Sequence, residues 1–481
     1  MIKKKKIEKK LIVDLDNSLI KNDLFVELLC TSIFKNPIIF FKTIFYLCKS
    51  KALAKIFLSE NVSLDIKTIP YNQTVIQLIN NYKEKKYKII LSTGASKVHA
   101  EKIVRHLKIF DDYISTDEKI NNVGNTKLQL IKDRYDSNFI YIGDSLNDLS
   151  VWKECGNAII VGKNRIIEKK LRANDVNIIQ VIHEKNNSGF NILNQFRIHQ
   201  WSKNLLLFVP SISSHKIFQP THDFTTSLLG FFSFSLAASS IYILNDIIDL
   251  NNDRSHPKKA ARPLASGSIS IVTGLILFLI CLFSSLIISI SVGQRFFTII
   301  AVYFSLNFFY SKYIKKLLII DVVLLTLFYT IRIIAGHLMD HISFSSWLLS
   351  FSIFFFFSLA LLKRYSDLLF LDKKKLNLKT GRGYKSDDAS IIQTLGVSSG
   401  LISALVLILY TGSEQVQILY QNPIILVGLS PGIIIWISRI WLHAGRGKVD
   451  IDPVLYALKD RYSYYIIFYF LTIFHFSGIS Y

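Results

Sequence analysis

Residues 241–267 read IYILNDIIDLNNDRSHPKKAARPLASG, which places three aspartates at the end of a long apolar helix. Asp246, Asp249 and Asp253 are three and four residues apart, so in a helix their carboxylates share one face. Mg²⁺ prefers oxygen ligands and commonly joins protein carboxylates to substrate phosphates. Four basic residues directly after the aspartates would neutralise the phosphates' remaining charge, namely Arg254, Lys258, Lys259 and Arg262. The stretch therefore predicts a magnesium and diphosphate site. The alternative is a solvated acidic helix end followed by a basic loop without a ligand. This alternative is disfavoured, because carboxylates at the edge of a membrane are energetically costly and usually functional.

The chain has 481 residues, and its apolar residues are unevenly spread. Up to about residue 195 charged and apolar residues alternate as in a soluble domain, whereas later apolar runs are long enough to cross a bilayer. We expect a soluble domain at 1–182, a linker at 183–194 and a membrane domain at 195–481. The net charge of +22 would suit nucleic acid or a membrane face. The basic residues lie beside apolar helices. We therefore expect them to face an anionic membrane surface, and we expect no nucleic-acid partner. The four isolated cysteines indicate neither a zinc site nor a disulfide framework.

Polar residues follow three expected strands of the soluble domain. The first strand runs into DLDNS at 14–18, the second into STG at 92–94, and the third, FIYIG, into DSLND at 144–148. The carboxyl ends of parallel strands are where open α/β sheets bind ligands. The residues that carry chemistry there are Asp14, Asp16, Ser92, Thr93, Asp144 and Asp148, with Lys127 between the second and third strands.

This ordered set resembles the haloacid dehalogenase (HAD) phosphatase superfamily, over residues 9 to about 180. The resemblance implies a Rossmann-like α/β domain with a helical cap inserted at about 19–88, whose Phe- and Lys-rich faces form cap core or, alternatively, contact the membrane surface. It implies that Asp14 is the nucleophile and Asp16 the general acid and base. Thr93, with Ser92 as the alternative, and Lys127 would hold the phosphoryl oxygens. Magnesium would bind at Asp14, Asp16, Asp144 and Asp148.

Nine apolar runs follow in the membrane domain. They fall at roughly 204–213, 224–245, 270–290, 296–311, 317–338, 345–362, 391–411, 423–442 and 462–479. If the soluble domain is cytoplasmic, nine crossings place 19 lysines and arginines in cytoplasmic loops, against Lys216 and Arg295 on the other side. Eight crossings would invert the positive-inside rule. We therefore expect a multi-pass protein of the inner membrane, with both sites on the cytoplasmic side.

The aspartate motif resembles the NDxxDxxxD motif of the UbiA prenyltransferase superfamily, over residues 195–481, which implies an all-α membrane domain of about nine helices. RxxQWxKN at 197–204, RPxASG at 262–267, YSxxxK at 310–315 and a late DP at 452–453 look like the decaprenyl-phosphate phosphoribosyltransferase branch. The chain departs from that branch at Ile198, where proline is usual, and at Ala260 and Ala261, where basic residues are usual. Where aromatic prenyltransferases carry a second aspartate-rich motif, this chain has KRYSD and a lysine run.

The resemblance implies a bifunctional membrane enzyme with a separate magnesium site in each domain. The transferase would move 5-phosphoribose from phosphoribosyl diphosphate to a polyprenyl phosphate, with Asp246 and Asp249 as catalytic residues and Asp253 as a further ligand. The HAD domain could then remove the 5-phosphate, giving polyprenyl-phosphoryl ribose for cell-envelope glycans. The implied substrate-binding residues are Arg197, Gln200, Lys203, Asn204, Asn245, Arg254, Lys258, Arg262, Tyr310, Lys315, Arg332, Lys363, Arg364 and Arg382.

Two alternatives remain open. The first is transfer of a polyprenyl group from its diphosphate to an aromatic acceptor, with an independent phosphatase domain; the missing second aspartate motif speaks against it. The second is a membrane scaffold with vestigial enzyme domains, which the completeness of both sets of catalytic groups disfavours.

Overall fold

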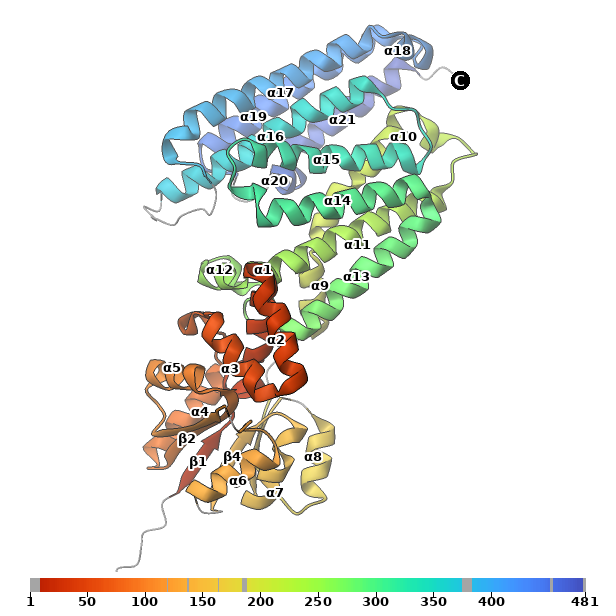
Figure 1. The fold of residues 1–481 in the computed structure, drawn as a ribbon. Helices are drawn as coiled ribbons and strands as arrows, with labels where there is room; N and C mark the ends of the chain where they lie inside the picture. The colour runs from red at the N-terminus through yellow and green to blue at the C-terminus, as the bar shows by residue number, and fades with distance from the viewer. Residues whose placement is uncertain are drawn as a thin grey trace, which may run out of the picture. The chain divides into compact units, whose positions relative to one another are not determined.

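The computed structural model describes residues 9–118, 120–135, 138–162, 164–183, 188–373, 383–449 and 453–478. The chain divides into two compact units (Figure 1). Unit 1 comprises residues 1–197 and 242–279, and unit 2 comprises 198–241 and 280–481. The aspartate motif belongs to the same unit as the α/β domain, and the domain boundaries given above stay predictions. Within the predicted linker, residues 188–194 are part of a helix, α9 (Ser188–Phe196).

Unit 1 is built on a six-stranded parallel sheet of order β3-β2-β1-β4-β5-β6, of which β2, β1 and β4 are labelled in Figure 1. The strands are β1 (Lys10–Val13), β2 (Lys88–Ser96), β3 (Asp112–Thr116), β4 (Phe139–Gly143), β5 (Asn157–Val161) and β6 (Asn177–Ile182). Val13 is in register with Leu91 of β2 on one side and with Ile142 of β4 on the other. The chain order reverses between β1 and β4, which is where doubly wound sheets bind ligands. The predicted α/β class is confirmed.

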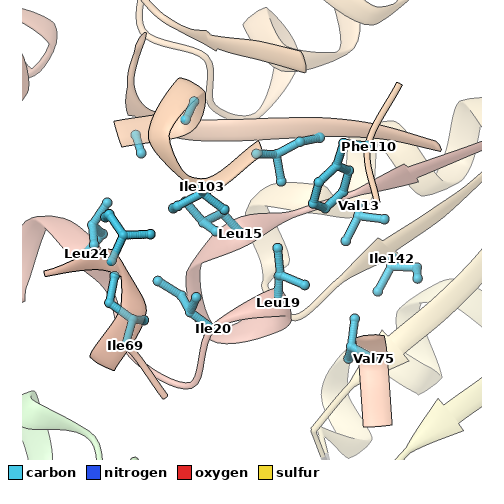
Figure 2. Packing of buried hydrophobic residues seen from close by; sticks show 14 of the residues in the cluster. Val13, Leu15, Leu19, Ile20, Leu24, Ile69, Val75, Ile103, Phe110 and Ile142 are labelled. Atoms are coloured by element: carbon cyan, nitrogen blue, oxygen red, sulfur yellow. The ribbon is translucent and has the colours of Figure 1, made fainter. Parts of the chain in front are cut away.

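Helices cover both faces of this sheet. Two hydrophobic clusters result from the alternation of strand residues: Leu11 and Val13 pack on one face of β1 and Ile12 on the other. The first face is covered by α4 (Gln73–Glu84), α5 (Lys97–Leu107) and part of the cap, and the second by α6 (Asn125–Arg134), α7 (Leu149–Cys155) and α8 (Arg165–Arg172). Figure 2 shows the first cluster, where Leu15 and Leu19 pack beside Val13. Each such side chain contributes roughly 1.5–3 kcal/mol on burial, so the end of β1 is firmly held.

The expected helical insertion follows β1. It consists of α1 (Leu24–Lys35), α2 (Pro37–Lys49) and α3 (Lys51–Asn61), and η2 (Ile66–Thr68) leads back to α4. The first two helices begin at side-chain caps, since Asp23 accepts a hydrogen bond from Val26 N (3.0 Å) and Asn36 one from Ile38 N (3.2 Å). Phe41 on α2 is 69% exposed. Ile39 of the same helix packs against the first cluster, so only part of the apolar surface of α2 is cap core, and contact of the exposed part with a membrane surface stays a prediction.

The remaining helices complete unit 1 and form unit 2. They are η4 (Ile198–Phe208), α10 (Val209–Ser213), α11 (Phe224–Ile248), α12 (Leu250–Ser255), α13 (Ile271–Val292), α14 (Gln294–Lys312), α15 (Ile320–Met339), α16 (Ser346–Lys373), α17 (Ala389–Thr411), α18 (Glu414–Leu419), α19 (Leu429–Gly445), α20 (Pro453–Lys459) and α21 (Arg461–Ser477). Among the described residues, six helices are long and apolar enough to cross a membrane: α11, α13, α15, α16, α17 and the stretch containing α19. The multi-pass helical fold is confirmed, and the count of nine is not.

The other three predicted crossings have identifiable local structure. Residues 204–213 are divided between η4 and α10, and Pro210 lies in the first turn of α10. The 17 residues of α21 would span about 26 Å, less than the roughly 30 Å of a bilayer core. α14 has 19 residues and carries Arg295 near its start and Lys312 at its end.

Close packing joins η4 to α15 within unit 2. A Cβ added at Gly336 of α15 would lie 2.1 Å from the carbonyl oxygen of Leu207 in η4. Only glycine permits so close an approach of two backbones, as is common between membrane helices. This packing brings the polar residues of η4 against the middle of α15.

Candidate active sites

Three aspartates converge at the carboxyl ends of β1 and β4. One oxygen each of Asp14, Asp144 and Asp148 lies within 4.8 Å of the others. Asp14 directly follows β1, and its backbone N donates a hydrogen bond to Ile142 O of β4 (2.9 Å), which fixes the two strand ends together. Asp14 and Asp148 are buried. The predicted convergence of these strand ends is therefore what the structure has.

The electrostatics of the cluster favour a bound cation. Burial raises the pKa of Asp14 to about 6, against the opposing effect of Lys127 and with a further increase from Asp148. Burial, followed by the charges of Asp14 and Asp148, raises the pKa of Asp144 to about 8. Carboxylates this hard to ionise together need positive charge, and Mg²⁺ takes oxygen ligands of this kind. The three side chains fit a magnesium ion.

Lys127 of α6 is buried against this cluster. Its Nζ lies 2.8 Å from Asp14 Oδ1 and 3.3 Å from Asp148 Oδ1, and it donates to Tyr141 Oη at 2.9 Å. Tyr141 Oη in turn donates to Asp148 Oδ1 at 2.7 Å. Although burial alone would lower the pKa of Lys127, Asp14 and Asp148 raise it above its usual value, so the side chain stays a cation. Tyr141, which the sequence analysis places only in a strand, is a further member of the site.

Asp16 does not belong to the group of three carboxylates within 4.8 Å of one another. Its Oδ1 accepts a hydrogen bond from the backbone N of Leu24 at the start of α1 (2.9 Å). The predicted four-residue ligand set, which includes Asp16, stays a prediction. Burial, followed by the charges of Asp23 and Asp14, raises the pKa of Asp16 to about 8. A carboxyl group that holds its proton at neutral pH can act as the general acid predicted for Asp16.

The STG residues, 92–94, lie within β2 near its carboxyl end and are held by two residues that the sequence analysis missed. Ser92 and Thr93 are both fully buried, so burial does not choose between them. Asn122 Nδ2 donates to Thr93 O (2.9 Å), and Lys55 Nζ of α3 donates to Gly94 O (2.7 Å). Lys55 is one of several lysines on the cap helices, and Asn122 lies in a polar loop, so neither stands out in the sequence. The cap thus contacts the part of β2 that is expected to bind phosphate.

The second site begins with the aspartate motif. α11 ends at Ile248, and Asp249 precedes α12, yet the backbone N of Asp249 bonds Asn245 O and that of Asp253 bonds Asp249 O, both at 2.9 Å. The helical path therefore continues through the interruption. Arg262 Nη1 lies 3.0 Å from Asp246 Oδ1 and 2.5 Å from Asp253 Oδ2. The expected shared face is thus seen directly for Asp246 and Asp253.

Further polar residues surround these two buried carboxylates. Asp246 accepts hydrogen bonds from Gln195 Nε2 (3.0 Å) and from Arg197, whose guanidinium also lies 5.0 Å from the centre of the Tyr242 ring. Lys259 Nζ lies 3.8 Å from Asp253. Carboxylates for a divalent cation and guanidinium groups for phosphate oxygens are both present. The residues fit a magnesium and diphosphate ligand. Gln195, just before the RxxQWxKN motif, is a member that the sequence analysis missed.

The other predicted residues of unit 1 lie in different surroundings. Arg254 is buried in an ion pair with Glu27 of α1, rather than beside Asp246. Asn245 is half-buried and Lys258 is exposed. Their predicted roles in substrate binding stay predictions.

Arg332 lies in the interior of unit 2. Its Nε donates to Asn204 Oδ1 (2.8 Å) and its Nη2 to Tyr303 Oη (3.1 Å). The guanidinium carbon is 5.0, 5.2 and 5.9 Å from the ring centres of Phe234, Tyr303 and Tyr329. An arginine within a membrane helix needs such partners, and aromatic faces supply favourable charge–ring contacts.

Lys203 lies near the helix that carries this arginine. Lys203 Nζ is 5.6 Å from the centre of the Tyr329 ring, and its side chain is buried. Gln200 is half-buried on η4. Lys203 and Arg332 therefore both lie against the Tyr329 ring, and Asn204 is hydrogen-bonded to Arg332. The structure thus brings these three predicted residues together.

A second buried arginine joins several helices of unit 2. Arg364 Nε donates to Asp321 Oδ2 (2.7 Å) and its Nη2 to Tyr310 Oη (3.2 Å), while Tyr384 Oη donates to Asp321 Oδ1 (2.5 Å). These contacts give Arg364 and Tyr310 structural partners, and their roles in substrate binding stay predictions. Lys315, in η7 (Ile314–Lys316), and Lys363 are half-buried. Arg382, Asp450 and Asp452 lie outside the described residues.

Comparison with protein families defines the class of this chain. Residues 209–457 match the UbiA prenyltransferase family, and residues 20–156 match the haloacid dehalogenase-like hydrolases. The chain belongs to the UbiA prenyltransferase family and carries a haloacid dehalogenase-like hydrolase domain ahead of the membrane helices. Both are families of enzymes, and both predicted resemblances are confirmed.

Several individual relatives are similar to this chain. The uncharacterized protein y4nM of Sinorhizobium fredii is 33% identical over 95% of this chain and 88% of its own length. The nodulation protein NoeC of Azorhizobium caulinodans is 34% identical over 55% of this chain and 85% of its own length. The decaprenyl-phosphate phosphoribosyltransferase of Mycolicibacterium smegmatis is 28% identical over 44% of this chain and 68% of its own length. A solved UbiA homologue from Archaeoglobus fulgidus covers 59% of this chain and 99% of its own, with a TM-score of 0.44 and 16% identity.

Proposed function

We propose that this protein transfers 5-phosphoribose from phosphoribosyl diphosphate to a polyprenyl phosphate and then removes the 5-phosphate from the product. The observation that carries the proposal is a cluster of charged side chains. In it Arg262 contacts both Asp246 and Asp253, and Arg197 contacts Asp246. Its charges suit a diphosphate bound with magnesium. The relatives named decaprenyl-phosphate phosphoribosyltransferase, at 24–30% identity, support the choice of donor and lipid acceptor.

In the transferase reaction an oxygen of the lipid phosphate attacks C1 of the ribose, and diphosphate leaves with the electrons of the broken C1–O bond. Asp246, Asp249 and Asp253 would hold magnesium, which when bound would stabilise the charge that develops on the leaving diphosphate. Arg197 and Arg262 would contact its phosphate oxygens. Because both guanidinium groups already lie on Asp246, they need only small side-chain movements to reach a ligand beside it.

In the phosphatase reaction Asp14 attacks the phosphorus of the 5-phosphate and becomes an aspartyl phosphate. Asp16, whose pKa burial raises to about 8, gives its proton to the leaving 5-oxygen of the ribose. The resulting carboxylate then takes a proton from the water that releases inorganic phosphate, which restores both aspartates. Lys127 holds the phosphoryl oxygens, and magnesium held by Asp14, Asp144 and Asp148 would shield the phosphate from the carboxylates.

We also propose that both reactions occur on the cytoplasmic side of the inner membrane. The support is the charge bias of the sequence, in which basic residues gather in the loops that share a side with the aspartate motif. A shared side would let the tethered phosphatase receive the transferase product at high effective concentration.

The experiment uses purified full-length protein with magnesium, labelled phosphoribosyl diphosphate and decaprenyl phosphate. We expect wild-type protein to give a dephosphorylated ribosyl lipid, and Asp14→Asn to give the same lipid carrying one further phosphate, as mass spectrometry will show. Asp246→Asn should abolish both lipids, whereas the control Asp387→Asn, at an exposed site on η8 (Ser386–Asp388), should not. Wild-type rates in Asp246→Asn, or polyprenyl transfer to an aromatic acid in place of ribosyl lipid, would contradict the proposal.

A further inference from the structure

A buried ion pair joins the α/β domain to the aspartate motif within unit 1. Glu27 of α1 and Arg254 of α12 are joined by two contacts, Arg254 Nη1 to Glu27 Oε1 at 2.5 Å and Nη2 to Oε2 at 3.0 Å. The two side chains are only 3% (Arg254) and 2% (Glu27) exposed. A bidentate, desolvated pair of this kind is geometrically specific, and removing one partner leaves the other charge buried without compensation.

The ion pair is connected to the diphosphate site by a short path. Arg254 directly follows Asp253, and its Nε donates to the carbonyl oxygen of Ala265 (3.3 Å). Arg254 therefore holds α12 against the loop of residues 262–267. That loop begins with Arg262, whose guanidinium contacts Asp246 and Asp253.

A second contact holds the other end of the same loop. Gly267 has φ +72°, and a Cβ added there would lie 2.7 Å from Lys21 Cβ and 3.2 Å from Pro70 Cγ. Lys21 and Pro70 lie on either side of the cap helices and are joined by a backbone hydrogen bond of 3.0 Å. Only glycine allows both this backbone conformation and this approach. The loop thus contacts the α/β domain directly at Gly267, and through the Arg254 contact at Ala265 it is also connected to Glu27.

We propose that Glu27 is a positioning residue for the transferase: through Arg254 it holds the loop that carries Arg262 against Asp246 and Asp253. The α/β domain then has a second role, independent of its own chemistry, as a support for the diphosphate site. Glu27 does not touch the reacting atoms and acts only through Arg254. The inference rests on the proposed function for the identity of the reaction, but not for the position of the loop.

The first test compares Glu27→Gln, which keeps the shape and removes the charge, with the control Glu60→Gln at an exposed site on α3. In full-length protein we expect Glu27→Gln to raise the KM for phosphoribosyl diphosphate, and the magnesium needed for half-maximal transfer, by about 10- to 100-fold, the usual effect of losing a residue that supports a metal site. Hydrolysis of p-nitrophenyl phosphate should stay within about twofold of wild type, as should both activities of Glu60→Gln. An equal loss of both activities in Glu27→Gln would overturn the proposal, because it would indicate general unfolding.

A double-mutant cycle tests whether Arg254 carries the effect. If Glu27 acts through Arg254, adding Glu27→Gln to Arg254→Gln should cause no further loss of transfer. Multiplying losses would overturn the proposal.

Hydrogen exchange gives a readout that does not depend on the reaction. Peptides covering residues 254–267 should exchange faster in Glu27→Gln than in wild type and Glu60→Gln, without any substrate. If wild-type protein makes no ribosyl lipid, the proposed function fails, and faster exchange of this loop still supports the positioning role. Unchanged exchange would overturn it.

Discussion

Replacing Lys127 by methionine should loosen the carboxyl ends of β1 and β4 in the absence of magnesium. Lys127 is the cation that lies between Asp14 and Asp148, at 2.8 and 3.3 Å, in a site where all three side chains are at most 10% exposed. Methionine fills similar space but supplies no charge. The carboxylates of Asp14 and Asp148 would then lie close to that of Asp144 with no ammonium group to compensate their charge.

The size of the effect follows from this burial. Breaking a buried ion pair costs about 3–5 kcal/mol, because the remaining charge is left uncompensated. At about 1.4 kcal/mol for each tenfold change, local opening becomes roughly two to four powers of ten more favourable. Loss of Lys127 also removes the charge that opposes the increase in the pKa of Asp14, already raised to about 6. Since a raised folded-state pKa destabilises the protein only above the unfolded value, the deficit should be larger at pH 8 than at pH 5.

Hydrogen exchange of peptides from β1 and β4, measured with EDTA present, will check this expectation. Lys132→Met is the matched control: Lys132 lies on the same helix, is 42% exposed and pairs with Glu154 at the surface. Such a surface pair contributes about 0–1 kcal/mol. If Lys127→Met exchanges no faster than Lys132→Met, our account of this ion cluster is wrong.

Three further predictions concern stability, metal and topology. His99 is buried, and its pKa is lowered to about 4 by burial and then by Lys102. The free energy of unfolding should therefore fall by up to about 3 kcal/mol as pH drops from about 6.5 to 4. Thermal unfolding should show that His99→Gln removes this loss of stability at acidic pH. Asp144→Asn should raise the magnesium needed for half-maximal phosphatase activity by at least about tenfold and leave ribosyl transfer unchanged, which a magnesium titration of both activities will show. Cysteine introduced at Glu414 should react with an impermeant thiol reagent added to intact cells, whereas cysteine at Lys448 should react only after permeabilisation; the reverse pattern would refute the predicted sidedness.

The three-aspartate cluster of the α/β domain could be predicted from the sequence because its residues follow strands. Asp14 comes directly after an aliphatic run, and Asp144 follows FIYIG, so a parallel sheet with this chain order brings them together without further information. Tyr141 could not be recognised, since an aromatic residue within a strand is ordinarily core. Its hydroxyl joins the site only because β4 lies beside β1 and Lys127 points between them.

The burial of Glu27 and the structure of residues 204–213 could not be predicted from the sequence. An acidic residue in the first turn of a helix is typical of an exposed helix start, because it interacts favourably with the helix dipole. Its burial depends on Arg254, a residue 227 positions away. Residues 204–213 are apolar enough to suggest a crossing, but hydropathy does not distinguish one α-helix from η4 followed by α10.

The surroundings of Arg332 bear on how the protein is made. Moving an unpartnered arginine into the centre of a membrane costs roughly 2.5–3.5 kcal/mol on insertion scales. Asn204, Phe234, Tyr303 and Tyr329, which surround its guanidinium, all precede it in the chain. During synthesis these groups are therefore already made when α15 leaves the ribosome, and the charge can enter the bilayer together with its partners. A circular permutation that places η4 after α15 would reverse this order for Asn204. Arg332 would then have to enter the bilayer before Asn204 is synthesised, even if the finished fold were the same.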